Sequence, residues 1–185
     1  MKTDFEPTWV GDVIRFWFEE VEQVHWFLRS DDIDVQIRER FLMLHEQLVA
    51  DEGRGVTAPR PLLAAIIVTD QFSRNMFRGT ARAYAADFIA RRLARTAIEQ
   101  GFDTTMNKQE RLFLYLPFQH SEDREDQALA LRLFEQLGDE EWTRYALAHK
   151  AIIDRFGRFP HRNAALNRTS TAAEIALLKE SMGSF

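Results

Sequence analysis

The strongest constraint on the fold is the spacing of apolar residues, which recur every three or four positions in segments separated by short breaks. The first such segment contains Val10, Val13, Ile14, Trp17, Phe18 and Val21. No stretch shows the strict apolar–polar alternation of a half-buried strand. With only 8 Gly and 5 Pro in 185 residues, little material is left for a turn-rich β architecture. The sequence therefore predicts an all-α protein.

Capping residues and glycines divide the chain into about eight expected helices. Seven of the expected starts are Thr8, Ser30, Pro59, Thr80, Asn107, Ser121 and Thr171, and the break at Gly138–Asp139 separates the sixth helix from the seventh. Asn107 with Glu110, and Thr171 with Glu174, have the spacing of a capping box, and Pro117 is expected to end or kink its helix. Short connections favour antiparallel helix hairpins, arranged as a tetratricopeptide-like stack or as an irregular bundle. We expect one helical domain over residues 1–185.

Composition excludes several classes of site and partner. The chain has no cysteine, which rules out disulfides, thiolate nucleophiles and zinc–thiolate sites and is compatible with a reducing compartment. A formal net charge of −5 argues against nucleic acid or an anionic membrane as partner. The most apolar window, residues 61–68, is too short to span a bilayer, and the start of the chain lacks signal-peptide features. We therefore expect a soluble, cytoplasmic protein.

Two groups of apolar residues are expected to form the core. The run from Leu62 to Phe72 is apolar nearly all round, which predicts a central, buried helix. The aromatic residues near the N-terminus are also expected to pack inside, because they lie in an acidic segment that is unsuited to stacking with nucleic-acid bases. These aromatic residues are Phe16, Trp17, Phe18, Trp26 and Phe27.

The first of three polar segments, residues 69–80, follows the most apolar helix. If it is helical, Asp70, Arg74 and Arg78 share one face, and Asn75 lies in a neighbouring polar row. One interpretation is an ion pair between Asp70 and Arg74 that closes a buried helix end. The other is a face directed at a ligand, since clustered charges occur in both kinds of site.

The second polar segment, residues 116–123, delivers His120 to the start of the next expected helix, beside Glu122 and Asp123. Such a group suits general acid–base chemistry or a metal ligand. The alternative is that His120 and Ser121 only cap a helix. The chain lacks the zincin motif, a phosphate-binding loop, a dinucleotide-binding glycine motif and a nucleophile elbow, which removes support for the reactions that depend on them.

The third polar segment, residues 149–163, is the densest. Pro160 suits the first position of a short helical turn, which would place His161 and Arg162 in that turn. Cations there are favourable when an anion lies over the free amides, and Arg155, Arg158 and Arg162 together suit a phosphate or carboxylate. The alternative is that protein carboxylates such as Asp70 or Asp87 already occupy these arginines.

The chain resembles a largely bacterial family, domain of unknown function 924, over nearly its whole length. The resemblance rests on residues 16–18, 26–27, 70–80, 116–123 and 156–163. It implies an all-helical fold similar to tetratricopeptide-like stacks and no established activity. One departure is Asn167, where the family has glycine before the arginine matched by Arg168. Asn tolerates left-handed backbone geometry, so the local turn can survive. The polar segments coincide with the matched motifs, so we expect them to converge in one pocket.

Three functional hypotheses follow. In the leading hypothesis the protein binds a small anionic ligand, with arginines as the clamp, asparagines as orienting groups and histidine for proton transfer in a hydrolase or lyase. The predicted ligand-binding residues are Asp70, Arg74, Asn75, Arg78, Arg158, Arg162 and Asn163, and the predicted catalytic residues are His120, Glu122 and His161.

The first alternative is a non-catalytic helical scaffold that binds a protein partner. The second is a metal-dependent hydrolase, although no metal or cofactor is assigned in the leading hypothesis. Its ligands would be His120, Glu122, His149 and His161, with Asp70 or Asp87 as oxygen donor.

Overall fold

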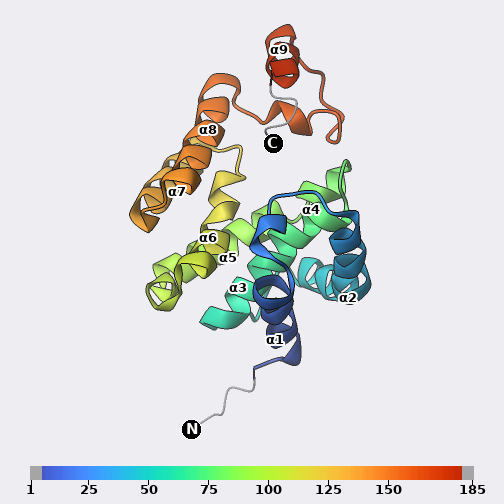
Figure 1. Ribbon diagram of the computed structural model, residues 1–185, viewed down its shortest axis with the longest axis vertical. Helices are drawn as coiled ribbons and strands as arrows, with labels where there is room; N and C mark the ends of the chain where they lie inside the picture. Colours follow the sequence, from blue (N-terminus) through green and yellow to red (C-terminus); the bar gives the residue numbers. More distant parts are fainter. Residues whose placement is uncertain (1–5, 181–185) are drawn as a thin grey trace. The chain divides into compact units, whose positions relative to one another are not determined.

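The computed structural model describes residues 6–180, and within them all regular structure is helical, as predicted. The chain divides into two compact units (Figure 1). The N-terminal unit comprises the chain up to Arg78 together with Arg82–Pro117, and the C-terminal unit comprises the chain from Phe118 onward together with Gly79–Ala81. The expected single domain and the tetratricopeptide-like arrangement stay predictions.

Six α-helices contribute to the N-terminal unit, and two of them continue into π-helical segments. The α-helices are α1 (Thr8–Arg15), α2 (Asp31–Ala50), α3 (Pro59–Ile67), α4 (Ser73–Met76), α5 (Asp87–Glu99) and α6 (Lys108–Gln119). The π-helical segments are η1 (Phe16–Glu20) and η3 (Val68–Phe72), and the 3-10 turns are Gln23–His25, Ala81–Tyr84 and Phe102–Thr105.

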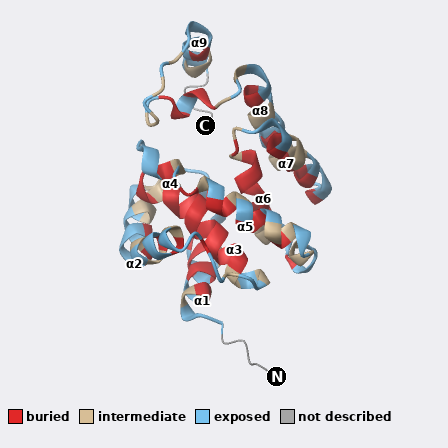
Figure 2. Ribbon diagram, turned by 180° about the vertical axis from the view of Figure 1, so that it is seen from behind, coloured by how far each residue is buried: buried red, intermediate tan, exposed pale blue. Residues whose placement is uncertain are grey.

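The centre of the N-terminal unit is the continuous helical segment formed by α3, η3 and α4. Helix α3 packs against α1 and α5, and η3 and α4 pack against α2. Every residue from Leu62 to Phe72 is buried, which confirms the predicted central helix (Figure 2). An apolar helix of this kind is stable because neighbouring helices cover it on all sides.

The C-terminal unit is built on a helix hairpin and a following loop. Helices α7 (Arg124–Leu137) and α8 (Glu140–Phe156) pack side by side, joined at Gly138, which has the left-handed conformation that favours glycine (Figure 1). The chain then forms a 3-10 turn, η6 (Pro160–Arg162), and ends its described part in α9 (Ala172–Glu180). Helix α9 packs against η6.

The capping residues predicted from the sequence give some helix termini correctly and others wrongly. Both predicted capping boxes form, with reciprocal bonds between Asn107 and Glu110 and between Thr171 and Glu174. Ser30 caps α2 as expected. Asn167 has φ 53°, the left-handed conformation that was expected at this position.

Three predicted caps are wrong. Thr8 is the first residue of α1, and Ser121 lies two residues before the true cap, Asp123, whose carboxylate accepts two backbone N–H bonds. Thr80 does not start a long helix to Gln100, because a 3-10 turn intervenes and α5 begins at Asp87. A carboxylate suits a helix N-terminus, and Asp87 is fixed there by an ion pair with Arg74.

Helix α6 continues past Pro117 to Gln119, so Pro117 does not end the helix, and the alternative that it kinks the helix stays a prediction. The terminal carbonyls of a helix need partners outside the helix. Buried Gln127 of α7 is such a partner, because its side-chain amide donates to the carbonyl of Gln119, the last residue of α6, at 2.6 Å and to the carbonyl of Ser121 in the following turn at 2.7 Å. A bond from the first turn of the next helix therefore supports the last residues of α6.

The predicted aromatic core is correct for most of its members. Phe16, Trp17 and Trp26 are buried, and Phe18 is half-buried. Phe27 is the exception, since 59% of its surface is exposed.

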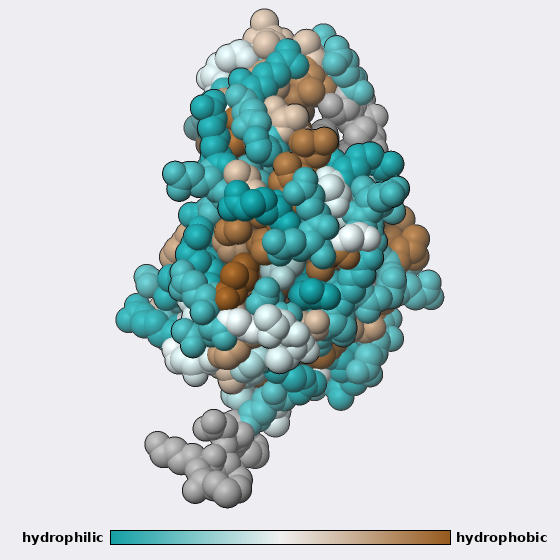
Figure 3. Space-filling model, turned by 90° about the vertical axis from the view of Figure 1, so that its left-hand side faces the viewer, coloured by the Kyte–Doolittle hydropathy of each residue, from teal (hydrophilic) through white to brown (hydrophobic). Residues whose placement is uncertain are grey.

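Hydrophilic residues dominate the face shown in Figure 3, with smaller hydrophobic patches between them. Within residues 6–180, no helix combines the length and the apolar character needed to cross a membrane.

Candidate functional site

The first predicted polar segment forms a charged core in the N-terminal unit, which we call the buried polar core: Asp70, Arg74 and Asp87. Asp70 is completely buried on η3, and its carboxylate lies 2.9 Å from the Arg74 guanidinium. Arg74 also pairs with Asp87 at 3.1 Å and donates to the Asp70 carbonyl at 2.6 Å. Burial acts to lower the pKa of Arg74, but the charges of Asp70 and Asp87 outweigh it and raise the pKa above its ordinary value.

The π-helical geometry of η3 is accompanied by side chains that bond to its backbone. Thr69 Oγ1 donates to the Ala65 carbonyl at 2.7 Å, and Ser73 Oγ donates to the Thr69 carbonyl at 2.8 Å. A π-helical turn disturbs the regular hydrogen-bond pattern of a helix, and hydroxyls at these positions occupy carbonyls within the helix. The polar residues of this apolar helix thus stabilise its local geometry.

Asn75 and Arg78 contact the same carboxylate, Asp34 of α2. Arg78 binds it through two bonds of 2.6 and 3.0 Å, and Asn75 donates to it at 2.7 Å. An arginine fork on one carboxylate is a strong, directional pairing. Of the four predicted ligand-binding residues of the first polar segment, Arg74, Asn75 and Arg78 therefore contact protein carboxylates, and Asp70 is itself a carboxylate bound by Arg74. Asp34 was not among the predicted site residues, since its distance of 44 positions from Arg78 leaves no local signal.

His45 of α2 is a second buried polar group that the sequence did not single out. Its Nε2 lies 2.7 Å from Ser73 Oγ. Because Ser73 Oγ donates to Thr69, we assign the proton to Nε2, which makes Nδ1 an acceptor; Nδ1 has no hydrogen-bond partner within the described residues. Burial is the main cause that lowers the pKa of His45. Ser73 is completely buried, so this pair has no access for a substrate.

The second and third polar segments meet in the C-terminal unit, around Phe159. Glu122 accepts a bond from the Phe159 backbone N–H at 2.8 Å, and the buried Arg162 donates to the His120 carbonyl at 2.8 Å. Three histidine rings surround this point: His149 and His161 lie 5.6 and 5.5 Å from the Phe159 ring, and His120 lies 6.4 Å from His149. The second and third polar segments therefore contact each other. That the first segment joins them in one pocket stays a prediction.

Two arginine–carboxylate pairs hold the loop between α8 and α9. Arg158 binds Glu174 of α9 through two bonds of 2.6 and 2.9 Å, and Arg168 binds Glu122 through two bonds of 2.7 and 2.9 Å. The bond from Arg158, together with the Thr171 backbone N–H, lowers the pKa of Glu174 to about 2. The carboxylate of Glu174, rather than Asp70 or Asp87, therefore occupies Arg158.

The contacts of Glu122 favour its ionised form. Burial acts to raise its pKa, but the Arg168 side chain, the Phe159 N–H and the charge of Arg162 outweigh burial and lower the pKa. A carboxylate held in this way is a weak base. The same contacts join Glu122 to Phe159 of the third polar segment and to Arg168 in the loop that follows it. Glu122 is therefore not available solely as a base partner for His120.

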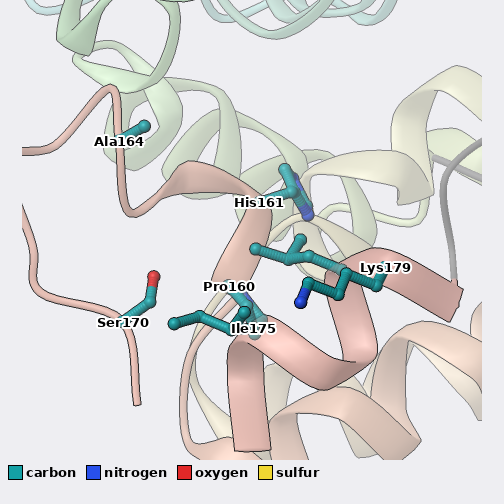
Figure 4. Close-up of a pocket in the computed structure, with 7 residues that line it drawn as sticks. Pro160, His161, Ala164, Ser170, Ile175 and Lys179 are labelled. Atoms are coloured by element: carbon teal, nitrogen blue, oxygen red, sulfur yellow. The ribbon is translucent and has the colours of Figure 1, made fainter. Parts of the chain in front are cut away.

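A pocket of about 390 Å³ opens between η6 and α9 of the C-terminal unit (Figure 4). It is lined by Pro160, His161, Ala164, Ser170, Ile175, Leu178 and Lys179. In Figure 4 the His161 ring and the Lys179 side chain point into the same space, with Pro160 and Ile175 beside it. Among the described residues, no carboxylate lies within ion-pair distance of Lys179. The pocket thus combines a basic group and an imidazole with an apolar lining.

The remaining predicted residue, Asn163, does not line this pocket but contacts Ser170, which does. It is buried, and its side-chain amide donates to Ser170 Oγ at 3.0 Å. Within residues 6–180, no group of three or more His, Asp or Glu side chains is arranged to hold a metal ion, so the ligand set of the metal-dependent hydrolase is not assembled there. Lys179 was missed because a lone lysine near a helix end carries no sequence signal.

Comparison with known proteins identifies relatives of unknown function. The profile of the family described as "bacterial protein of unknown function (DUF924)" matches residues 13–182. A solved structure of a protein of unknown function from Agrobacterium tumefaciens is 37% identical, with a TM-score of 0.88, over 94% of this chain and 98% of that one. No curated protein matches the chain. The chain therefore belongs to the DUF924 family.

Proposed function

We propose that the C-terminal unit binds a small organic anion in the pocket between η6 and α9. The observation that carries the proposal is the position of Lys179 and His161 at one apolar pocket. The anionic group, a carboxylate or phosphate, accepts charge-assisted bonds from the Lys179 ammonium and a bond from the His161 imidazole. The organic part lies against Pro160, Ile175 and Leu178, as is usual in ligand sites with a few polar groups on an apolar lining.

The predicted arginines take a different part in this proposal. Arg158 joins the loop to α9 through Glu174, and Arg162 joins η6 to the His120 carbonyl. These contacts fix the two elements that carry His161 and Lys179, so the arginines position the site and do not contact the ligand. In the N-terminal unit, an anion at Arg74 or Arg78 would have to displace a protein carboxylate, which makes that region a poorer anion site.

The proposal is one of binding. Proton transfer by His120, Glu122 or His161 stays a prediction, because Glu122 is occupied by Arg168 and by the Phe159 N–H. Binding of an anion does not depend on catalysis, so binding is tested before any activity.

Thermal unfolding with a panel of ligands tests the proposal. The panel consists of inorganic phosphate, acetate, and aliphatic and aromatic carboxylates and phosphate esters of increasing size. A ligand at 100 times its Kd stabilises the folded protein by about 2.7 kcal/mol, which shifts Tm by a few degrees. We expect organic anions to produce this shift and acetate to produce a smaller one, because acetate leaves the apolar lining uncovered.

Matched variants locate the binding. Lys179→Ala is expected to abolish the shift while changing the free energy of unfolding by less than about 0.5 kcal/mol, since Lys179 is a surface residue. Lys150→Ala is the control, because Lys150 is a lysine of the same unit that is paired with Asp154 at 2.5 Å. The proposal fails if no organic anion shifts Tm, or if Lys179→Ala and His161→Gln leave the shift unchanged.

A further inference from the structure

The turn between η1 and α2 in the N-terminal unit exposes three large apolar side chains. Val24 is 59% exposed, Phe27 59% and Leu28 56%. We call these three residues the apolar ledge. They lie within five consecutive positions, so they form one local patch and not a scatter of single exposed residues, which would need no explanation.

The ledge is fixed on the core of the N-terminal unit. Buried Trp26, which lies between Val24 and Phe27, donates from its indole nitrogen to the Trp17 carbonyl at 3.0 Å and packs edge-on against Phe113 at 4.9 Å. The Phe27 ring lies nearly parallel to the Phe113 ring, with an interplanar angle of 16° and a centroid distance of 6.2 Å. A partner would therefore meet a preorganised surface and would lose little free energy in ordering it.

Carboxylates flank the ledge on both sides in the sequence. Residues 19–32 contain five Asp and Glu and one Arg, a net charge of −4 in a chain whose formal net charge is −5. Arg29 pairs with Asp31, and Glu20 pairs with Arg15 and Arg40. The exposed carboxylates of Glu19, Glu22 and Asp32 form no ion pair within the described residues. The segment that carries the ledge is thus strongly negative, and we call the exposed carboxylates of Glu19, Glu22 and Asp32 its acidic rim.

The negative charge of this segment decides which kind of partner could bind to the ledge. An anionic membrane is repelled by the rim, and a second copy of the chain bound through the same patch would place like charges opposite each other. We propose that the apolar ledge docks a basic amphipathic segment of another protein, whose apolar side chains cover Phe27 and Leu28 and whose Lys or Arg residues pair with the acidic rim. Apolar anchors with complementary charges around them are the usual composition of such contacts.

Three synthetic helical peptides of equal length test this proposal by fluorescence anisotropy at physiological salt. The first has leucines on one face flanked by lysines, the second has the same leucines flanked by glutamates, and the third has serines in place of leucines with the lysines retained. We expect the leucine–lysine peptide to bind at least tenfold more tightly than the other two. Equal binding of the leucine–glutamate peptide, or of the serine–lysine peptide, would overturn the proposal.

Variants then assign the binding to the ledge. The double variant Phe27→Ser, Leu28→Ser should weaken binding of the leucine–lysine peptide at least tenfold. Val24→Ser should weaken it as well, and it leaves the ring contacts of Phe27 with Phe113 intact if the double variant folds poorly. Met43→Ser is the control, because Met43 is an apolar residue of α2 that is 80% exposed and lies outside the ledge. Unchanged binding in the ledge variants contradicts the proposal.

Charge reversal provides the second arm. Glu22→Lys with Asp32→Lys brings the net charge of residues 19–32 from −4 to 0 and should abolish the preference for the lysine peptide over the glutamate peptide, whereas Glu140→Lys with Glu141→Lys, at the start of α8, should leave that preference unchanged. Phosphatidylglycerol vesicles are included as a competing surface. Binding of the wild-type protein to these vesicles that depends on Phe27 would replace the protein partner with a membrane and overturn the proposal.

Discussion

The two units use the same chemistry, arginine paired with carboxylate, in different surroundings. In the N-terminal unit, Asp70 of the buried polar core lies completely buried in η3, and half-buried Arg74 of α4 pairs with it and with Asp87 of α5. In the C-terminal unit the pairs of Arg158 and Arg168 hold a loop, next to an open pocket. Clustered charges in the first case stabilise a helix, and in the second they position a site. A ligand is better sought at Lys179, which no described carboxylate neutralises, than at the densest charge cluster.

The largest expected effect tests the buried polar core. Arg74→Met should leave Asp70 as an uncompensated buried charge and reduce the free energy of unfolding by about 3–5 kcal/mol at pH 7. Urea unfolding followed by circular dichroism measures it. Arg54→Met is the control, because Arg54 and Glu52 form an exposed pair that is expected to contribute less than about 1 kcal/mol.

A double variant sharpens the same test. Asp70→Asn combined with Arg74→Met removes the buried charge as well as its partner, so it should be less destabilising than Arg74→Met alone. If the double variant is as unstable as the sum of its two single variants, Asp70 and Arg74 do not act as a pair.

The second effect is an acid transition of the C-terminal unit. The folded pKa of Glu174 is about 2, below its ordinary value of 4.5, so ionised Glu174 favours the folded state. Its contribution is complete above pH 4.5 and is lost as the pH falls from 4.5 to about 2. Unfolding curves between pH 5.5 and 2.5 should therefore differ most between wild type and Glu174→Gln at the higher pH values.

Glu180→Gln, on the same helix, is the control for this pH dependence and should follow wild type at every pH. A constant difference between wild type and Glu174→Gln over the whole range would show that the titration of Glu174 is not coupled to folding.

The smallest expected effect concerns His45. Burial lowers its pKa in the folded state, with smaller contributions from Glu46, which raises it, and Arg82, which lowers it. The unfolded protein therefore binds the proton more readily, so stability is full above pH 6.5 and declines as the pH falls from 6.5 through the lower folded pKa. In His45→Gln the decline between pH 7.5 and 5.5 should be shallower than in wild type. His25→Gln, in an exposed turn, should leave the slope unchanged.

Many features that depend on neighbouring residues were predictable, although the caps expected at Thr8, Thr80 and Ser121 were wrong. The helical fold, the burial of residues 62–72 and both capping boxes follow from spacing within one or two helical turns. The pair of Asp70 and Arg74 is of this kind, since the residues are four positions apart in a helix. The left-handed Asn167 follows from the tolerance of asparagine for that conformation.

The tertiary structure decided which groups neutralise one another. Arg78 and Asp34 are 44 positions apart, and Arg168 and Glu122 are 46 apart, so no local spacing connects them. The position of Phe27 at the surface, with its ring against that of Phe113, is also decided by tertiary packing. The sequence by itself determined the helices and their apolar faces, because those depend on local backbone geometry. Only the packing of the helices decided which charges are paired and where a basic group remains beside a pocket, because a counter-ion is chosen by distance in space and not by position along the chain.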